Sequence, residues 1–423
     1  MLSRSTSAWF TSRWFTSGWF TSAWFKSGWF TVGLLWVAFL LNYIDRQMIF
    51  SIFPVLAHEM DMSDLQLGLI GTVFTWSYSV SMPIAGRLAD VLPRQWLIVA
   101  SLLLWSCATL GTGLSRSGYS LLFWRAAMGV TESLFMPAAL ALIATVHQEA
   151  TRSRALAVFA TAQFAGIFAG GWYGGWMADN LGWRTGFTVL SASGICFAVL
   201  LTLGLPRAKA IVHVQSGASV LDVFRSRCLL ALCAAFFSFC AMLWILLAWL
   251  ANFIHDQYHL SLTASGFTAT VFLQTGSAIG VLCGGALGDR MARRSGPGRF
   301  YVAIFGLLCS TPFAWAMLAG DSLRTLELSA SAFGLFGGLF IANVYASAYD
   351  VVAQRNYGFV AGLMNMIGGF AAGIAVLLTG MLKKSFGTAF PIRISAISAA
   401  ITAFVLAAVV FTYFADDQKI LMR

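Results

Sequence analysis

Long apolar runs separated by short polar gaps fill the chain from residue 30 to residue 415. Each run reaches the roughly 20 residues that a helix needs to cross the hydrocarbon core of a bilayer. We therefore predict an all-α membrane protein with twelve transmembrane helices, at 30–53, 65–89, 95–114, 119–146, 153–178, 184–205, 228–254, 262–288, 300–319, 327–349, 358–382 and 392–415.

The longest polar stretch between these runs is 206–227, and it divides the predicted spans into six and six. We predict a cytoplasmic linker there, between a six-helix bundle at 30–205 and a second six-helix bundle at 228–415. Residues 416–423 are expected to form a short cytoplasmic tail.

The first 29 residues depart from this pattern and mostly repeat a five-residue Ser-x-Trp-Phe-Thr unit. The Trp-Phe pair advances by about 140° per repeat on a helix and alternates faces on a strand, so it builds no one-sided surface. We predict a low-complexity tail whose aromatic side chains lie at the headgroup level of a membrane.

The composition excludes a soluble protein, because hydrophobic residues make up 59% of the chain and charged residues only 10%. A soluble domain carries about 25% charged residues. The net charge of +10 is spread over short gaps between apolar runs, so nucleic-acid binding is not expected. The seven cysteines lie inside apolar runs, and no metal, cofactor or enzyme motif is found.

The distribution of Lys and Arg predicts the orientation in the membrane. With the N-terminus in the cytoplasm, the cytoplasmic segments hold 18 of these residues and the outer loops hold 6. Cytoplasmic loops carry an excess of positive charge in membrane proteins. We therefore expect a monomeric, multi-pass protein of the plasma or inner membrane, embedded in the lipid bilayer, with both termini cytoplasmic.

A short motif occurs at the same place in each half. Gly86 to Asp90 follows the second predicted span, and Gly285 to Asp289 follows the eighth; both read Gly-x-Leu-x-Asp and precede basic residues, Arg94 and Arg293 among them. This repetition indicates two related halves, an architecture used for alternating access around a central site.

Several ionisable residues fall inside predicted spans, where a charge costs about 2.5–3.5 kcal/mol on insertion scales. Asn42, Asp45 and Arg46 share one face of the first span, and Arg125 and Glu132 share a stripe of the fourth. A buried carboxylate near an Arg suits proton loading and release, and an Arg suits a bidentate carboxylate clamp. Fixed ion pairs that only stabilise packing are the alternative.

Polar and aromatic residues at mid-span form a second group of candidates. A buried amide needs a partner, which is either another helix or a water-filled cavity. Residues that line such a cavity are expected among Tyr43, Trp76, Tyr78, Gln163, Asn252, Gln274, Asn343, Tyr345 and Asn365.

At these residues the sequence resembles the major facilitator superfamily, over about 30–415. The two Gly-x-Leu-x-Asp loops resemble its cytoplasmic signature. The segments Asn42 to Arg46, Arg125 to Pro137 and Gly182 to Arg184 resemble both the anion:cation symporter branch, which includes sugar-acid transporters, and the spinster-like lipid transporters. Drug/proton antiporters carry Gly-Pro in span 5, whereas this chain has Trp172 in the corresponding position.

The resemblance implies roles for individual residues. Asp45 and Glu132 would couple transport to protons, and Arg46 would hold the substrate. Further substrate contacts would come from Asn42, Tyr78, Gln163 and Asn365. The gate or its packing would involve Gly86, Asp90, Arg94, Arg125, Asp289 and Arg293.

The expected function is secondary active transport, by proton-coupled symport of a small organic anion such as a sugar acid or another carboxylate. Two alternatives remain at this point. One is a spinster-like exporter of lipids or amphiphiles, and the other is a transporter-like receptor that binds without translocating.

Overall fold

The computed structural model describes residues 28–147, 149–206, 220–318, 322–353 and 356–421. The predicted Trp-Phe tail, except its last two residues, and most of the predicted linker lie outside this part of the chain. The side chain of Asp90 lies outside it as well.

The described residues of the first half form helices only. They are α1 (Gly28–Ser51), α2 (Phe53–Glu59), α3 (Asp64–Val91), α4 (Arg94–Gly113), α5 (Gly118–Ser133), α6 (Phe135–Val146), α7 (Glu149–Asn180) and α8 (Trp183–Gly204).

The described residues of the second half follow the same plan after a short 3-10 helix. They form η1 (Val220–Arg225), α9 (Arg227–Tyr258), α10 (Leu262–Ala292), α11 (Gly298–Ala316), α12 (Leu323–Tyr349), α13 (Tyr357–Phe386) and α14 (Ala389–Leu421).

Within the described residues, eleven helical segments are long and apolar enough to cross a membrane, with α5 and α6 counted as one. The remaining predicted span is α3, which has 28 residues and a polar stretch at 72–79. It packs between α5 and α13, inside the bundle. The all-α, twelve-span fold predicted from the sequence is therefore confirmed.

Two prolines lie where the helices depart from the predicted spans. Pro54 lies in the first turn of α2, where the N–H that proline lacks would have no partner within the helix. This short helix takes the place of the loop expected after the first span. Pro137 cannot donate a hydrogen bond to the carbonyl of Ser133, and the fourth span breaks between α5 and α6 at that point. Glu132 therefore lies immediately beside a helix break.

Serine caps begin several helices at their polar ends. Ser63 and Gln66 form a capping box at the start of α3, where the Gln66 N–H donates to Ser63 Oγ at 3.3 Å and the Ser63 N–H donates to Gln66 Oε1 at 2.9 Å. Ser226 and Ser261 cap α9 and α10 by accepting from the N–H groups of Leu229 and Ala264, without the reciprocal bond. These caps satisfy backbone donors that a helix start leaves open.

The packing of the first half recurs in the second. In the first half α1 packs on α7, α3 on α5, and α4 on α8. The corresponding pairs in the second half are α9 with α13, α10 with α12, and α11 with α14. These are spans 1 and 5, 2 and 4, and 3 and 6 of each half, as a structural repeat requires.

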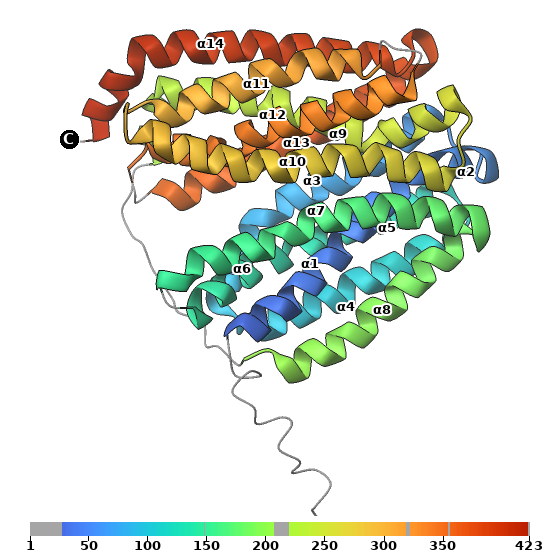
Figure 1. Cartoon of the computed structure of the whole chain (residues 1–423). Helices are drawn as coiled ribbons and strands as arrows, with labels where there is room; N and C mark the ends of the chain where they lie inside the picture. Colours follow the sequence, from blue (N-terminus) through green and yellow to red (C-terminus); the bar gives the residue numbers. More distant parts are fainter. Residues whose placement is uncertain (1–27, 148, 207–219, 319–321, 354–355, 422–423) are drawn as a thin grey trace, which may run out of the picture.

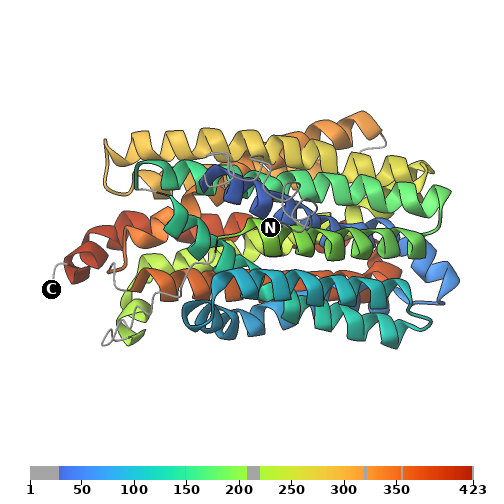
Figure 2. The same cartoon turned by 90° about the horizontal axis from the view of Figure 1, so that it is seen from below.

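The helices run along one common direction, so the bundle has two ends (Figures 1 and 2). We call them the termini end, where α1 begins and α14 ends, and the α2 end, where α2 lies. The two halves touch through α3 with α13 and α7 with α10. In Figure 1 they approach each other at the α2 end and diverge toward the termini end.

Candidate functional site

Four charged side chains lie buried inside the first half. Asp45 and Arg46 on α1 are 2% and 8% exposed, and Arg125 and Glu132 on α5 are 0% and 1% exposed. Two carboxylates and two guanidiniums make this set formally neutral. Such a balance is what a low-dielectric interior favours, because an isolated buried charge is far more costly than a paired one.

Arg46 is the member of this set that connects it to the space between the halves. Its Nε donates to Glu132 Oε2 at 2.6 Å. The guanidinium lies against the rings of Tyr43, Phe74 and Tyr78, at 4.9, 5.1 and 4.5 Å from their centroids. Since Glu132 engages Nε, the two terminal NH₂ groups are not used by this ion pair.

The other members of the set, and the neighbouring Asn42, keep buried polar atoms without a hydrogen-bond partner among the described residues. These atoms are both amide atoms of Asn42, Asp45 Oδ1, Glu132 Oε1, and Arg125 Nε and Nη2. Within the described part of the chain, Arg125 donates to Met128 Sδ at 3.0 Å and lies over the Phe74 ring. An unpaired buried polar group costs about 1–3 kcal/mol. These donors and acceptors are therefore free to bind a proton, a water molecule or a substrate group.

A cavity of about 830 Å³, including the part that opens to solvent, lies between the two halves. Arg46 is the charged residue among those that line it. The first half contributes Tyr43, Arg46, Gln47, Phe50, Gln163, Phe164 and Ile167. The second half contributes Phe239, Leu243, Trp244, Leu247, Gln274, Ser277, Val281, Phe333, Gly337, Gly338 and Ile341.

The predicted substrate contacts divide between the cavity and its surroundings. Gln163 lines the cavity, as does Gln274. Tyr78 contacts Arg46 through its ring, and Asn42 is buried beside Asp45 on α1. Asn365 of α13 is not among the residues that line the cavity. Its Oδ1 accepts a hydrogen bond from the hydroxyl of Tyr345 on α12, at 3.1 Å.

The predicted gate residues with described side chains have different surroundings. Arg94 is buried and donates to the carbonyl of Ala141 at 3.1 Å, within the first half. A Cβ added at Gly86 would meet no atom within 4 Å. Arg293 is exposed just after α10. Arg125 belongs to the buried charge set and not to the termini end.

Asp289 has a partner that the sequence pattern does not reveal. Arg299 at the start of α11 donates to Asp289 at 3.0 Å and to Asp350 at 2.8 Å, which joins the ends of α10, α11 and α12. Burial, opposed by Arg299, raises the pKa of the Asp350 carboxyl. Arg299 and Asp350 are 51 positions apart, and no spacing rule connects them.

Polar contacts that join the two halves gather toward the α2 end. Lys383 of α13 contacts Asp64 of α3 at 3.1 Å. Asp179 of α7 accepts from the backbone N–H of Thr263 at 2.7 Å and so caps α10 from the opposite half. Gln47 Nε2 donates to the carbonyl of Leu247 at 2.9 Å. The cavity therefore lies beneath a closed α2 end.

Two pseudo-symmetric six-span halves around a central cavity define the class of secondary membrane transporters. A sequence profile of the Major Facilitator Superfamily matches residues 35–295 and 232–420. The chain belongs to this superfamily, and it is a multi-pass membrane transporter rather than an enzyme.

Curated relatives come from both branches that the motifs resemble. The chain is 24% identical over 389 residues to a D-galactonate transporter of Escherichia coli O6:H1, covering 84% of this chain and 89% of that protein. It is 34% identical over 183 residues to protein spinster homolog 1 of Bos taurus, covering 42% of this chain and 35% of that protein.

The fold is similar to a solved structure of the second branch. A bacterial homolog of the human lysosomal transporter Spinster, in an inward-facing and unoccupied conformation, matches with a TM-score of 0.74 at 19% identity. The match covers 93% of this chain and 98% of that one. At this identity the likeness concerns the fold alone.

Proposed function

We propose that this chain carries a small organic anion across the membrane together with protons, by symport. The observation that carries the proposal is the position of Arg46, which lines the cavity and is bound to the buried Glu132. A guanidinium binds carboxylates in a bidentate manner, so its two terminal NH₂ groups suit an anionic substrate. The similarity to a D-galactonate transporter supports an anion as cargo.

Charge balance links the proton to the anion. Protonation of Glu132 removes one negative charge from a set of two carboxylates and two guanidiniums, and it weakens the hold on Arg46 Nε. The set then carries one excess positive charge, which a substrate carboxylate neutralises. Loading both a proton and an anion restores neutrality, and only the neutral forms avoid a large desolvation cost during the conformational change.

Asp45 is the second proton carrier of the proposal. Its carboxylate is buried on α1 next to Arg46, and its Oδ1 has no hydrogen-bond partner among the described residues. The carboxylate also interacts electrostatically with Glu132, Arg125 and Arg46. Asp45 and Glu132 therefore titrate as parts of one coupled set and not as independent groups.

In alternating access, the end of the cavity that is closed would open and the end that is open would close. Here the α2 end is closed by α3 with α13 and α7 with α10. With both termini in the cytoplasm, as the Lys and Arg distribution predicts, this is the state that faces the cytoplasm. The protein would reside in the plasma or inner membrane and work as a monomer.

Glu132→Gln tests the coupling in proteoliposomes. The amide keeps the size of the side chain and removes its proton exchange, so uptake driven by a pH gradient should fall to background while exchange of internal for external substrate continues. Glu327→Gln, on α12 and away from the cavity lining, serves as the matched control. Gradient-driven uptake that survives in the Glu132 variant contradicts the role of Glu132.

A second candidate function is export of a lipid or another amphiphile. The observation in its favour is the apolar share of the cavity lining, which includes Phe50, Phe164, Phe239, Trp244 and Phe333. The partial similarity to a spinster homolog points in the same direction. Transport of a long-chain lysolipid by the protein in proteoliposomes, without transport of short carboxylates, would favour this candidate.

A further inference from the structure

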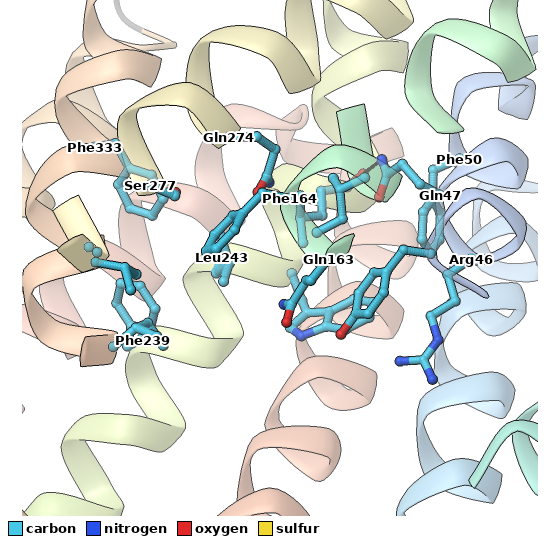
Figure 3. A pocket seen from close by; sticks show the side chains of 18 residues that line it. Arg46, Gln47, Phe50, Gln163, Phe164, Phe239, Leu243, Gln274, Ser277 and Phe333 are labelled. Atoms are coloured by element: carbon cyan, nitrogen blue, oxygen red, sulfur yellow. Dashed lines mark hydrogen bonds between the residues drawn. The ribbon is translucent and has the colours of Figure 1, made fainter. Parts of the chain in front are cut away.

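The cavity is chemically divided between the two halves of the protein. Arg46, Gln47 and Phe50 lie on one side, and Phe239, Ser277 and Phe333 lie on the opposite side (Figure 3). The first half supplies the charged residue of the lining, and the second half supplies mainly apolar side chains. A substrate that spans this cavity therefore meets a cation at one end and an apolar wall at the other.

The apolar wall of the cavity, formed by side chains of the second half, is held in place by contacts between aromatic rings. The rings of Phe239 on α9 and Phe333 on α12 are stacked, with centroids 6.2 Å apart and an interplanar angle of 8°. Phe239 also packs on Phe340 at 5.0 Å. Phe239 and Phe333 are 2% and 1% exposed, so neighbouring side chains hold them in place. Aromatic walls of this kind favour flat apolar groups.

Few polar groups remain for a substrate with many hydroxyls. Gln47 already donates its amide to Leu247 across the halves. Gln163 and Gln274 line the cavity and make no hydrogen bond with another described side chain or backbone group, and Ser277 lies on the apolar side. The Tyr43 hydroxyl and the Trp244 indole N–H also belong to the lining. A polyhydroxylated acid has a hydroxyl on nearly every carbon, each of which both donates and accepts, and this small set of side chains leaves part of that capacity without a partner.

The free-energy cost of burying a hydroxyl without a hydrogen-bond partner distinguishes a polyhydroxylated acid from an acid with an apolar body. Each hydroxyl that leaves water without gaining a partner weakens binding by about tenfold. Two or three such groups would cancel the gain from one bidentate carboxylate contact. An acid whose body is apolar avoids this loss and gains from contact with the wall.

We propose that the cavity selects a compact monocarboxylate with an aromatic or branched apolar body, rather than a polyhydroxylated sugar acid. This inference rests on the proposed function, because it uses Arg46 as the carboxylate contact. The side chains that set the preference are Leu243, Phe239 and Phe333, all from the second half. Arg46 accepts the charge of either class and does not discriminate between them.

Equilibrium binding to the purified full chain in detergent tests the preference without any proton gradient. Phenylacetate and D-gluconate are matched probes, since each carries one carboxylate and they differ in their bodies. Binding to the folded state raises the unfolding midpoint. We expect phenylacetate to raise it at concentrations where D-gluconate has no effect, and Arg46→Ala to abolish the rise.

Substitution in the wall tests the residues. Leu243→Gln keeps the side-chain size and adds an amide, so affinity for phenylacetate should fall by about tenfold and D-gluconate should begin to bind. Phe333→Leu removes the ring and keeps an apolar side chain, which serves if the first variant does not fold. Phe404→Leu on α14, 65% exposed, is the control and should bind phenylacetate as the unaltered chain does.

The outcomes separate this inference from the proposed function. If D-gluconate stabilises the protein and phenylacetate does not, the preference is wrong while anion transport stands. If only lysophosphatidylglycerol stabilises it, the preference for a compact body is wrong as well. If no anion binds and no counterflow of phenylacetate or gluconate is seen in proteoliposomes, the proposed function itself fails and takes the inference with it.

Discussion

The buried charges act as one unit at the scale of single residues. Arg46 pairs with Glu132 at 2.6 Å, and Asp45 and Arg125 interact electrostatically with each other and with that pair. Removal of one member leaves an uncompensated charge in a region that is almost wholly buried. Removal of two opposite members restores neutrality, so the effects of the substitutions should not add.

A double-mutant cycle measures this coupling. Arg125→Met should lower the free energy of unfolding by about 3–5 kcal/mol, because it leaves two buried carboxylates against one guanidinium. Asp45→Asn with Arg125→Met should recover more than half of that loss. The measurement is thermal or denaturant unfolding of purified variants in the same detergent. A double variant as unstable as the sum of the single variants would show that Asp45 and Arg125 are uncoupled.

Sequence reasoning located this set but left open whether Arg46 pairs with Asp45 or with Glu132. The spacing of Asp45 and Arg46 on one helix, and of Arg125 and Glu132 on another, predicts shared faces, and all four side chains are buried. That Arg46 reaches Glu132 depends on how α1 and α5 meet, which no local pattern encodes. Gln47 was missed because its partner, the carbonyl of Leu247, belongs to the other half.

Glycines bring α7 and α10 together at the scale of helices. A Cβ added at Gly175 would lie 2.2 Å from the carbonyl oxygen of Leu262, and one at Gly266 would lie 2.1 Å from that of Gly171. These neighbours are backbone atoms, which cannot rotate out of the way. The two helices can therefore approach this closely only because neither carries a side chain at these positions.

Gly175→Ala should shift the protein toward a state that is open at the α2 end, since the methyl group blocks the closed packing. Spin labels at His58 and His259, exposed on opposite halves at this end, would report a longer distance. The exposed native cysteines are replaced first. Gly33→Ala is the control, because a Cβ there meets nothing within 4 Å. An unchanged distance distribution in the Gly175 variant would contradict the glycine argument.

The short helix α2 is held to α8 by one carboxylate. Glu59 Oε2 accepts from Trp183 Nε1 at 2.9 Å and from Arg184 Nη1 at 2.8 Å. These hydrogen bonds, the one from Trp183 first, lower the pKa of Glu59 below its ordinary value of 4.5. A lowered pKa in the folded state means that the contact stabilises at neutral pH and is lost as the pH falls through the folded value.

Glu59→Gln should therefore reduce stability at pH 7 and make little difference once the pH is below about 4. The effect should stay under about 1 kcal/mol, because Glu59 and Arg184 are nearly half exposed to solvent. Unfolding midpoints of both proteins across this pH range provide the measurement. A difference that grows on acidification would have the wrong sign for this account.

The whole molecule consists of two halves whose internal packing corresponds and whose contacts are concentrated at one end. The hydrophobic pattern predicted the spans and their division into six and six, because membrane crossing imposes a length and a composition on each helix. It could not predict which end is closed. That depends on contacts between distant segments, such as Lys383 of α13 with Asp64 of α3.

Lys383→Met should weaken closure of the α2 end. Lys383 Nζ also contacts Asn252 at 2.7 Å and Asp256 at 3.7 Å, so its loss leaves carboxylates from both halves without their shared cation. The open fraction should rise by about two- to fivefold, the effect of up to 1 kcal/mol for a partly exposed pair. The His58–His259 label pair measures it, and high salt should reproduce part of the shift in the unaltered protein. A closed fraction insensitive to both would rule out this contact as a latch.

The charged residues and the apolar lining of the cavity come from different halves, and this separation bears on how substrate preference can change during evolution. The buried charge set lies wholly in the first half, and the apolar wall comes from α9, α10 and α12 of the second. Under the proposed function, substitutions in the second half would change the substrate preference and leave the coupling residues intact. Coupling and substrate preference would then be free to change separately during evolution, because they rest on side chains of different halves.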